Sequence, residues 1–252
     1  PYPFQRRVAE LLLSDHNVIL QAPTGAGKTM AAMLPFLEAI ERGRDFPHKC
    51  LYAVPMRVLA NQFVDEYKSK VRKAGRDDRI RVAIQTGEHP DDKELTATLT
   101  FATIDQVLSS FLLSPYSLPR RLSNLNAGAV AASYLVFDEF HLFDPISTLP
   151  TTLEMLRMLR GVAPFLLMTA TFSTDMLRGL ADALGAVVVP EDGTARQAMQ
   201  ALRSQQKTRR YHVADGPLSA GAVLAQHKSR TLVVCNVVDR ARALFEALRD
   251  HP

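Results

Sequence analysis

Short apolar runs alternate with stretches of helical periodicity along most of the chain. The runs are rich in Val, Ile, Leu and Phe, which is typical of strands buried on both faces of a sheet. We expect strands at Val18–Gln21, Cys50–Pro55, Ile80–Gln85, Thr98–Ala102, Tyr134–Asp138, Phe165–Thr169 and Ala186–Pro190. The spacing between them predicts helices over Phe4–Ser14, Gly27–Arg42, Met56–Ala74, Ile104–Leu113, Ser147–Leu159 and Ser173–Leu184. Strands separated by helices predict an α/β domain with a mostly parallel sheet and helices on both faces.

The pattern changes after the last of these strands. Pro190–Gly193 is a turn signal, and Arg203–Arg210 carries four cations and no acidic residue. This cationic segment is either a solvated linker or a basic surface beside a cleft. Beyond it we expect a helix over Leu218–Gln226, a buried strand over Thr231–Val234 and a helix over Asp239–Leu248. We therefore predict a first domain over 1–189, a linker over 190–216 and the start of a second α/β domain over 217–252.

A glycine-rich loop follows the first predicted strand and opens a helix. The sequence Gln21-Ala-Pro-Thr-Gly-Ala-Gly-Lys-Thr29 has the spacing of a phosphate-binding loop, with Ala22 where the first glycine usually stands. Glycine permits tight turns, and the N–H groups and dipole of a helix N-terminus favour phosphate. Lys28 is expected to reach the β- and γ-phosphates, and the Thr29 hydroxyl to bind Mg²⁺. The candidate ATP-binding residues of this loop are Thr24, Gly25, Ala26, Gly27, Lys28 and Thr29.

Two adjacent carboxylates follow the apolar run Tyr134–Phe137. Asp138 is positioned to help hold the metal ion, as the acidic residue of the second nucleotide-binding motif does. Glu139 is then positioned to orient or deprotonate an attacking water. With Lys28, these two residues form the candidate catalytic set. His141 is either a surface histidine or a link between the nucleotide state and a neighbouring domain.

Composition and charge narrow the class of protein. The 252 residues are 47% hydrophobic and 22% charged, which is enough apolar material for a folded core. The net charge of +4 is compatible with nucleic acid but does not establish it. Cys50 and Cys235 exclude a disulfide framework and a four-cysteine zinc site, and are typical of buried thiols in a reduced, cytoplasmic protein. We expect no membrane-spanning helix. Because the chain begins at Pro1 without methionine, we expect it to be part of a longer protein.

Together these motifs resemble superfamily 2 helicases of the Asp-Glu-X-His type, which are RecA-like P-loop NTPases. Further segments match in the same order: Phe4-Gln5, Val54–Gln62, Thr86-Gly87, Thr103–Gln106, Thr169–Thr171 and Leu232–Asn236. The resemblance implies that Gln5 reads adenine, and that Thr169 and Thr171 couple hydrolysis to strand binding. It also implies backbone contacts to nucleic acid from Pro55, Arg57, Thr86, Gly87 and Thr103. From spacing alone, Thr86 and Thr103 are equally explained as turn and cap residues.

One subfamily matches in the residues of its motifs as well as in the order of the motifs along the chain. The combination of Pro-X-Arg-X-Leu-Ala-Asn-Gln, Thr-Ile-Asp-Gln and Asp-Glu-Phe-His is similar to the CRISPR-associated helicase of type I interference systems. The resemblance implies ATP and Mg²⁺ as cofactors and single-stranded DNA and a CRISPR surveillance complex as partners. Members of that family often carry an HD nuclease domain before the helicase part. Here the nuclease is either cut away or carried by a separate subunit, as the type I-D arrangement implies.

The last motif that matches lies close to the end of the chain. The arginines that a second RecA-like domain supplies to the family's site increase the rate of related phosphate chemistry by about 10³ to 10⁵, and they are absent from this sequence. We therefore expect this piece alone to bind nucleotide weakly and to hydrolyse it hardly at all. Two alternatives to a DNA translocase stay open: an RNA helicase of the same class and a non-catalytic docking module.

Overall fold

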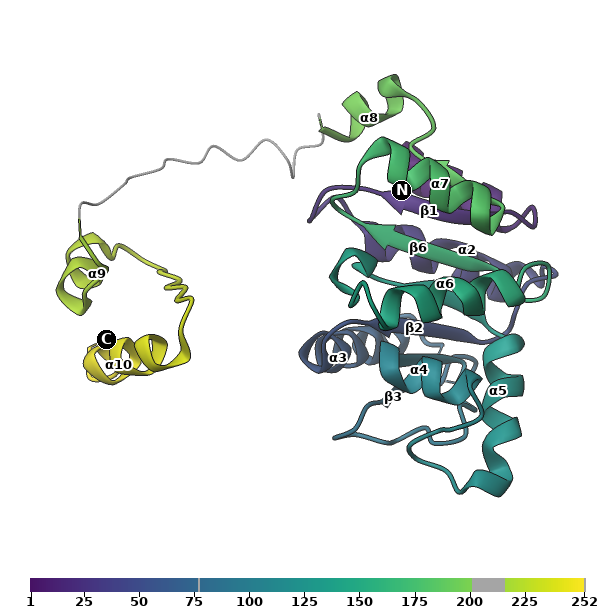
Figure 1. Ribbon diagram of the computed structural model, residues 1–252, viewed down its shortest axis with the longest axis horizontal. Coiled ribbons are helices and arrows are strands. Elements are labelled where there is room, and N and C mark those ends of the chain that lie inside the picture. Colours follow the sequence, from purple (N-terminus) through teal and green to yellow (C-terminus); the bar gives the residue numbers. More distant parts are fainter. Residues whose placement is uncertain (77, 201–215, 252) are drawn as a thin grey trace. The chain divides into compact units, whose positions relative to one another are not determined.

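The computed structural model describes residues 1–76, 78–200 and 216–251 (Figure 1). The chain divides into two compact units, Pro1–Lys207 and Thr208–Pro252. The cationic segment Arg203–Arg210 lies outside the described residues, so its two interpretations stay open. Within the described ranges, no helix combines the length and the apolar character needed to cross a membrane.

The first unit is built on a sheet of seven strands, all paired in parallel. Its strands are β1 (Asn17–Gln21), β2 (Cys50–Val54), β3 (Val82–Gln85), β4 (Leu99–Thr103), β5 (Tyr134–Phe137), β6 (Phe165–Thr169) and β7 (Ala186–Val189). They lie in the order β3-β4-β2-β5-β6-β1-β7. Each predicted strand of this unit is confirmed. A strand buried on both faces of a sheet is a nearly continuous run of apolar residues, and such a run can be recognised from the local sequence.

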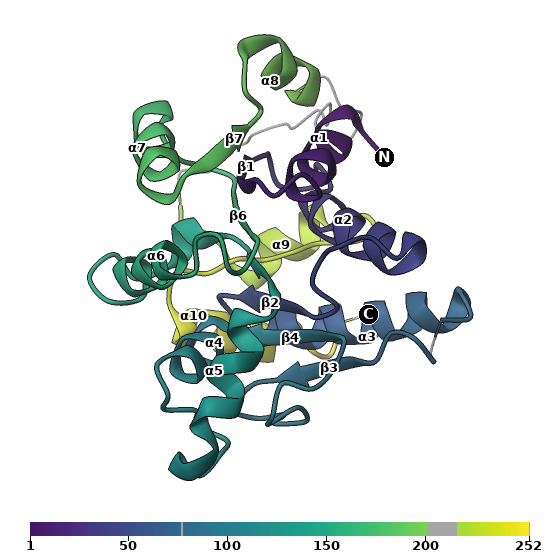
Figure 2. The same ribbon diagram turned by 90° about the vertical axis from the view of Figure 1, so that its right-hand side faces the viewer.

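Helices cover both faces of this sheet (Figure 2). One face carries α1 (Pro3–Leu12), α2 (Lys28–Arg42) and α3 (Arg57–Lys73). The other carries α4 (Ile104–Phe111), α5 (Ser123–Ala131), α6 (Thr148–Met158) and α7 (Thr174–Leu184). The expected α/β class is therefore confirmed. Of these helices, only α5 was not predicted, because its sequence of small residues, Ser-Asn-Leu-Asn-Ala-Gly-Ala-Val-Ala, has almost no apolar stripe.

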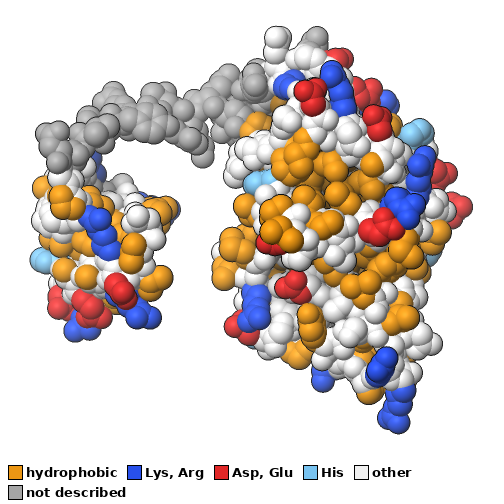
Figure 3. Space-filling model, viewed as in Figure 1, with side chains coloured by type: hydrophobic (Ala, Val, Ile, Leu, Met, Phe, Trp, Pro, Cys, Tyr) orange, Lys and Arg blue, Asp and Glu red, His pale blue; other side chains and the backbone are white. Residues whose placement is uncertain are grey.

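A hydrophobic core lies on each side of the sheet because successive strand residues point to opposite faces. In β1, Val18 and Leu20 contribute to the core beneath α1, α2 and α3, whereas Ile19 contributes to the core beneath α4 to α7. Hydrophobic side chains are also exposed among charged ones on the face shown in Figure 3. Scattered apolar exposure of this kind is usual for folded proteins, and it identifies no binding surface.

Residues 193–200, which the sequence placed in a linker, form α8 (Gly193–Gln200). Met199 of this helix is buried and belongs to the same hydrophobic core as Phe4 of α1 and Val189 of β7. The first unit therefore includes a helix beyond the boundary predicted at residue 189. A buried methionine among polar and small residues gives too weak a pattern to be recognised from sequence.

The second unit contains two described helices, α9 (Ala220–Gln226) and α10 (Val238–Leu248). Both were predicted, but the buried strand expected over Thr231–Val234 is wrong. These residues form no strand, and Leu232 and Val234 are exposed. A strand requires a neighbouring strand for its hydrogen bonds, and the described residues of this unit provide none.

The two cysteines differ in their surroundings. Cys50 in β2 is fully buried, and this burial raises the pKa of its thiol far above the ordinary value. Cys235 in the second unit is only partly buried, and both are free thiols. The expectation of two buried thiols is therefore confirmed for Cys50 and wrong for Cys235, which follows the absent strand.

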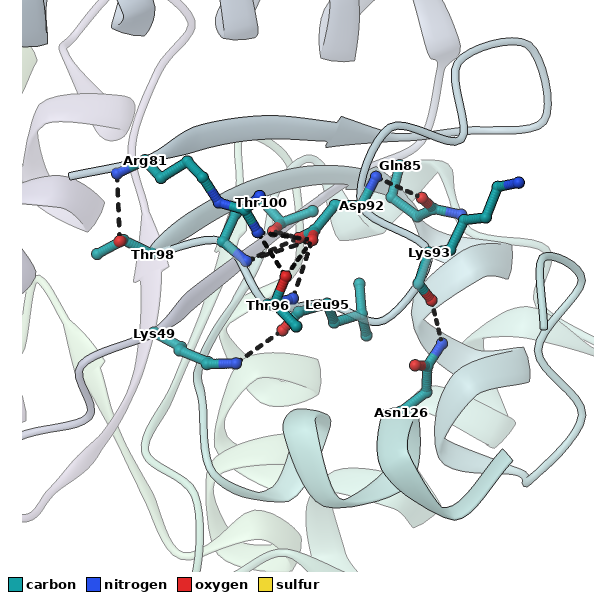
Figure 4. A network of polar contacts seen from close by, with 11 residues as sticks. Lys49, Arg81, Gln85, Asp92, Lys93, Leu95, Thr96, Thr98, Thr100 and Asn126 are labelled. Atoms are coloured by element: carbon teal, nitrogen blue, oxygen red, sulfur yellow. Dashed lines mark hydrogen bonds and ion pairs between the residues drawn. The ribbon is translucent and has the colours of Figure 1, made fainter. Parts of the chain in front are cut away.

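The connection between β3 and β4 is organised around the buried carboxylate of Asp92 (Figure 4). Oδ2 of Asp92 accepts hydrogen bonds from the Thr100 hydroxyl at 2.6 Å and from the Ala97 N–H at 3.1 Å. Oδ1 accepts one from the Thr96 N–H at 2.9 Å and lies 3.2 Å from Nη2 of Arg81. One side chain thus satisfies several donors of the loop that follows the end of β3.

Replacing Asp92 by alanine is expected to lower the free energy of unfolding by about 3 kcal/mol or more. The reason is that each buried donor left without a partner costs about 1–3 kcal/mol, and the Thr100 hydroxyl lies in a fully buried residue. Unfolding in chemical denaturant, monitored by circular dichroism, measures the change in the free energy of unfolding. Asp91→Ala, at an exposed neighbouring position, is the control and should change stability by less than about 0.5 kcal/mol. Equal unfolding midpoints for the two variants would show that Asp92 does not stabilise the loop.

Candidate functional site

The strand order divides the predicted site residues into two groups. Because all seven strands are parallel, their carboxyl ends lie along one edge of the sheet, where ligands bind in such folds. The adjacent strands β5, β6 and β1 carry the Asp-Glu motif, the Thr169–Thr171 segment and the phosphate loop. The adjacent strands β3, β4 and β2 carry Thr86, Thr103 and Pro55 at their ends. The first group forms the candidate nucleotide site, and the second forms a separate candidate surface beside it.

The phosphate loop has the backbone conformation that its glycines predict. Gly25 and Gly27 adopt positive φ angles of 80° and 96°, which are strained for residues with a Cβ atom. Gly27 is the N-cap of α2, so the free N–H groups of the first helical turn, which begins at Lys28, point toward the loop. A β-carbon at Gly27 would also lie 2.6 Å from Nε2 of Gln5. The arrangement suits an anion such as phosphate.

Lys28 is turned toward the acidic motif. Its Nζ lies 2.9 Å from Oε1 of Glu139 and donates a hydrogen bond to the carbonyl oxygen of Ala22 at 3.3 Å. The Lys28 side chain is 7% exposed and that of Glu139 is 21% exposed. The two predicted catalytic groups therefore neutralise each other in this structure. Phosphate binding at the loop requires Lys28 to exchange this carboxylate for a phosphate oxygen.

Asp138 is held from two sides. The phenol of Tyr52 in β2 donates a hydrogen bond to Oδ2 of Asp138 at 2.9 Å, and the Glu139 N–H donates one to Oδ1 at 2.9 Å. The pKa of the Asp138 carboxyl is raised, chiefly by burial and also by the charge of Glu139, while the hydrogen bond from Tyr52 and the charge of Lys28 oppose this rise. The ionised carboxylate is the form that binds a metal ion.

Glu139 has an unusual backbone and an unsatisfied oxygen. Its φ angle of 48° lies in the left-handed region, which is uncommon for residues other than glycine and is often found at functional sites. Oε2 is buried and has no hydrogen-bond partner among the described residues. Nδ1 of His141 lies 3.4 Å from that oxygen but outside hydrogen-bond geometry. A buried carboxylate oxygen without a hydrogen-bond partner is suited to accept a proton or a hydrogen bond from a bound water.

The predicted coupling residues lie in contact. The Thr169 hydroxyl lies 3.2 Å from Nδ1 of His141 and accepts a hydrogen bond from the Thr171 N–H at 3.3 Å. Gln21, at the start of the phosphate loop, donates from its side chain to the Phe172 carbonyl at 2.7 Å. The tertiary structure thus joins the acidic motif, the Thr169–Thr171 segment and the loop through a chain of short contacts.

Gln5 contacts the phosphate loop directly. Its Nε2 donates to the Gly27 carbonyl at 3.0 Å, and its Oε1 accepts from the Tyr2 N–H at 2.7 Å. Gln5 is buried, so in this structure its amide supports the loop. Next to it, a cavity of about 230 Å³ is lined by Tyr2, Pro3, Phe4, Arg7, Val189, Pro190, Glu191, Asp192, Ala198 and Met199. Its lining comes from the N-terminal residues, the end of β7 and α8, and includes no residue of the phosphate loop.

Sequence reasoning missed Tyr52 and α8 as parts of this site. Tyr52 stands two residues before the end of an apolar strand, and only the pairing of β2 with β5 brings it to Asp138. Arg196 and Met199 of α8 line a second cavity with Gln21, Pro23 and Ala170. The only local signal for Tyr52 was a polar-tipped aromatic residue inside an otherwise apolar run.

The residues of the second candidate surface fall into an exposed and a buried set. Arg57, the first residue of α3, is exposed, and its Nη1 lies 3.5 Å from Oε1 of Glu88. Its guanidinium also approaches Gly87, where a β-carbon would lie 3.3 Å from Nη2. Pro55 precedes α3 and is partly exposed. These residues present one cation and a short stretch of backbone at the carboxyl edge of the sheet.

Thr86 and Thr103 are both buried. The Thr86 hydroxyl accepts a hydrogen bond from the His89 N–H at 3.1 Å, which is the turn role that the sequence left open. Thr103 is the N-cap residue of α4, and its side chain accepts no capping hydrogen bond. The geometry therefore explains Thr86 as a turn residue, and it leaves the role of the Thr103 hydroxyl without a structural account.

The residues present fit Mg²⁺ together with a nucleotide. Mg²⁺ is usually bound by one or two carboxylates and by substrate phosphates, with water completing its shell. Asp138 supplies a carboxylate at the carboxyl end of β5, and Thr29 supplies a hydroxyl in the first turn of α2. No cluster of three or more His, Cys, Asp and Glu side chains suited to a metal occurs in the described ranges. A metal ion here would therefore share its ligands with the nucleotide.

Fold and site together define a nucleoside triphosphate-binding P-loop domain. Residues 2–178 match the DEAD/DEAH box helicase family, and the chain belongs to that family.

Two curated relatives show how broad the similarity is. The chain is 26% identical over 259 residues to the CRISPR-associated helicase Cas3 of Thermoproteus tenax, covering 97% of this chain and 43% of that protein. It is 31% identical over 197 residues to the ATP-dependent RNA helicase DBP9 of Ajellomyces capsulatus, covering 71% of this chain and 29% of that protein. The chain thus spans less than half the length of either relative.

A solved structure shows the same fold. The chain is similar to T. fusca Cas3 crystallised with ATP, with a TM-score of 0.56 and 23% identity over 73% of this chain and 22% of that one. The match supports the RecA-like architecture that the sequence predicted. The resemblance to helicases, and to the CRISPR-associated helicase among them, is confirmed by these comparisons.

Proposed function

We propose that this chain is the ATP-binding part of a translocase on single-stranded DNA that acts with a CRISPR surveillance complex. The observation that carries the proposal is the similarity to a CRISPR-associated helicase over 97% of the chain. That alignment extends through the first unit and into the second. The motif sequences Asp-Glu-Phe-His and Thr-Ile-Asp-Gln support the same assignment.

In this proposal each site residue has one role. The N–H groups of Thr24 to Thr29 and the ammonium of Lys28 bind the phosphates, and Gln5 contacts the adenine. Thr29 and Asp138 hold Mg²⁺, which neutralises phosphate charge when bound. Glu139 accepts a proton from the attacking water, and its buried Oε2, which has no hydrogen-bond partner among the described residues, supports this role.

Coupling and strand binding involve the remaining predicted residues. His141, Thr169 and Thr171 transmit the nucleotide state, and their contacts with one another support this role. Pro55, Arg57, Gly87 and the backbone around Thr86 and Thr103 contact the phosphates of the strand. Backbone N–H groups and cations at strand ends give sequence-independent contacts. Any separate nuclease subunit would be a further partner.

An RNA helicase is the second candidate. It is favoured by the 31% identity to an ATP-dependent RNA helicase over 71% of the chain, which exceeds the identity to the CRISPR-associated relative. Phosphate contacts alone do not distinguish single-stranded DNA from single-stranded RNA, because the two differ at the 2′-hydroxyl of the sugar.

The decisive experiment measures ATP hydrolysis with Mg²⁺ while single-stranded DNA and single-stranded RNA of matched sequence are titrated separately. It uses a form of the protein that carries a complete second RecA-like domain, with Lys28→Ala as the blank. Stimulation by DNA and not by RNA is expected. Stimulation by RNA alone would replace the proposal by the RNA helicase, and an absence of hydrolysis would indicate a docking module.

Arg57→Ala is expected to weaken binding of single-stranded DNA to a similar extent for unrelated sequences. Each lysine or arginine that neutralises a phosphate adds about one unit to the slope of log affinity against log salt, so the slope should flatten by about one. Fluorescence anisotropy at several salt concentrations measures both quantities. Arg72→Ala, at the other end of α3, is the matched control with the same loss of charge. An unchanged slope in Arg57→Ala would remove this residue from the strand contacts.

A further inference from the structure

The buried phenol of Tyr52 lies against the carboxylate that the proposed function assigns to the metal. Tyr52 belongs to β2, and Asp138 follows β5, the neighbouring strand. The Tyr52 ring is fully buried and packs against Phe63 and Phe101 with centroid distances of 5.5 Å and 5.3 Å. Its hydroxyl donates to Oδ2 of Asp138 at 2.9 Å. The ring packing therefore fixes the direction from which this donor approaches.

The orientation of the Asp138 carboxylate is defined by two donors. Tyr52 occupies one position on Oδ2, and the Glu139 N–H occupies one on Oδ1. The Asp138 N–H is itself tied to the Ala53 carbonyl at 2.9 Å, in the same strand as Tyr52. A carboxylate held at both oxygens cannot rotate freely. Each oxygen keeps unused lone pairs for a ligand.

We propose that Tyr52 is a positioning residue that orients Asp138 for Mg²⁺ when the nucleotide binds. The inference deepens the proposed function at one point, since it rests on the site binding a magnesium nucleotide. It does not depend on whether the nucleic acid is DNA or RNA. Groups that orient metal ligands typically change metal affinity about 10- to 100-fold when removed.

A second tyrosine provides a matched comparison. Tyr134 in β5 is also fully buried, and its hydroxyl donates to the Ala32 carbonyl at 3.1 Å. Both residues lie inside strands of the same sheet, and mutation to phenylalanine removes one buried hydroxyl in each case. Only Tyr52 donates to a proposed metal ligand. A difference between the two variants therefore reports the contact with Asp138 and not the loss of a buried hydroxyl.

The experiment titrates MgCl₂ against the wild-type chain and its variants in the presence of a fluorescent ADP analogue, and separately measures binding of the analogue in EDTA. In Tyr52→Phe, the Mg²⁺ concentration for half-maximal binding should rise about 10- to 100-fold, with metal-free binding unchanged. Tyr134→Phe should leave the Mg²⁺ midpoint within about twofold of the wild type. Thermal unfolding of each variant verifies that it is folded.

A double-mutant cycle distinguishes positioning from a general effect on the fold. In an Asp138→Asn background, Tyr52→Phe should add little further change in the Mg²⁺ midpoint, because the contact that it removes is already altered. Additive effects, or equal midpoints for Tyr52→Phe and Tyr134→Phe, would overturn the inference while leaving the proposed function intact. A wild-type chain that binds no magnesium nucleotide would overturn both.

Discussion

Lys28→Ala is expected to weaken nucleotide binding by at least about a hundredfold. Lys28 is the only cation that the structure places between the phosphate loop and Glu139, within the described residues of this site. Two hydrogen bonds from an ammonium to phosphate, at about 1.5–3 kcal/mol each, account for an effect of this size. Titration of a fluorescent nucleotide in the presence of Mg²⁺ measures the loss.

The control for this variant removes a lysine elsewhere on the same domain. Nζ of Lys49 donates to the Leu95 carbonyl at 2.9 Å, in the loop that follows β3. Lys49→Ala changes the net charge by the same amount and should leave nucleotide affinity within about twofold. If Lys28→Ala also bound nucleotide within twofold of the wild type, the loop would not be a phosphate site.

Glu139→Gln is expected to reduce ATP turnover by about 10²- to 10⁴-fold, the contribution of a positioned general base, while nucleotide binding is kept. Glutamine has the shape of glutamate but accepts a proton poorly. It also lacks the charge that pairs with Lys28 at 2.9 Å in this structure. Since Lys28 must leave Glu139 to reach phosphate, nucleotide affinity should stay equal or increase. Binding is measured with the fluorescent nucleotide, and turnover in a form of the protein with a complete second domain.

A second partly buried glutamate serves as the comparison for Glu139. The Glu38 side chain is 26% exposed, close to the 21% of Glu139, and it pairs with Arg42 and Arg44 at 3.1 Å. Glu38→Gln removes a charge of similar burial away from the phosphate loop and should leave turnover unchanged. Wild-type turnover in Glu139→Gln would end the assignment of Glu139 as the group that activates water.

The sequence determined the elements and most of the site motifs. Buried strands, helical periodicity and the glycines of the phosphate loop are properties of contiguous residues, so each can be recognised locally. Gly25 and Gly27 have the positive φ angles that such a loop requires. The predicted strand over Thr231–Val234 is wrong because strand formation also depends on a distant partner. An apolar run becomes a strand only where another strand can pair with it, and that partner is not a local property.

The tertiary structure decided which residues meet. Tyr52 and Asp138 are 86 positions apart, and their contact depends on β2 lying beside β5, which no local pattern specifies. The same strand order gathers β5, β6 and β1 into one site and β3, β4 and β2 into another. The left-handed conformation of Glu139 and the support of Gly27 by Gln5 are likewise results of packing. The sequence by itself thus determined which chemical groups this protein carries. Their pairing was decided only by the order of the strands, because contacts between distant segments depend on how the whole sheet assembles.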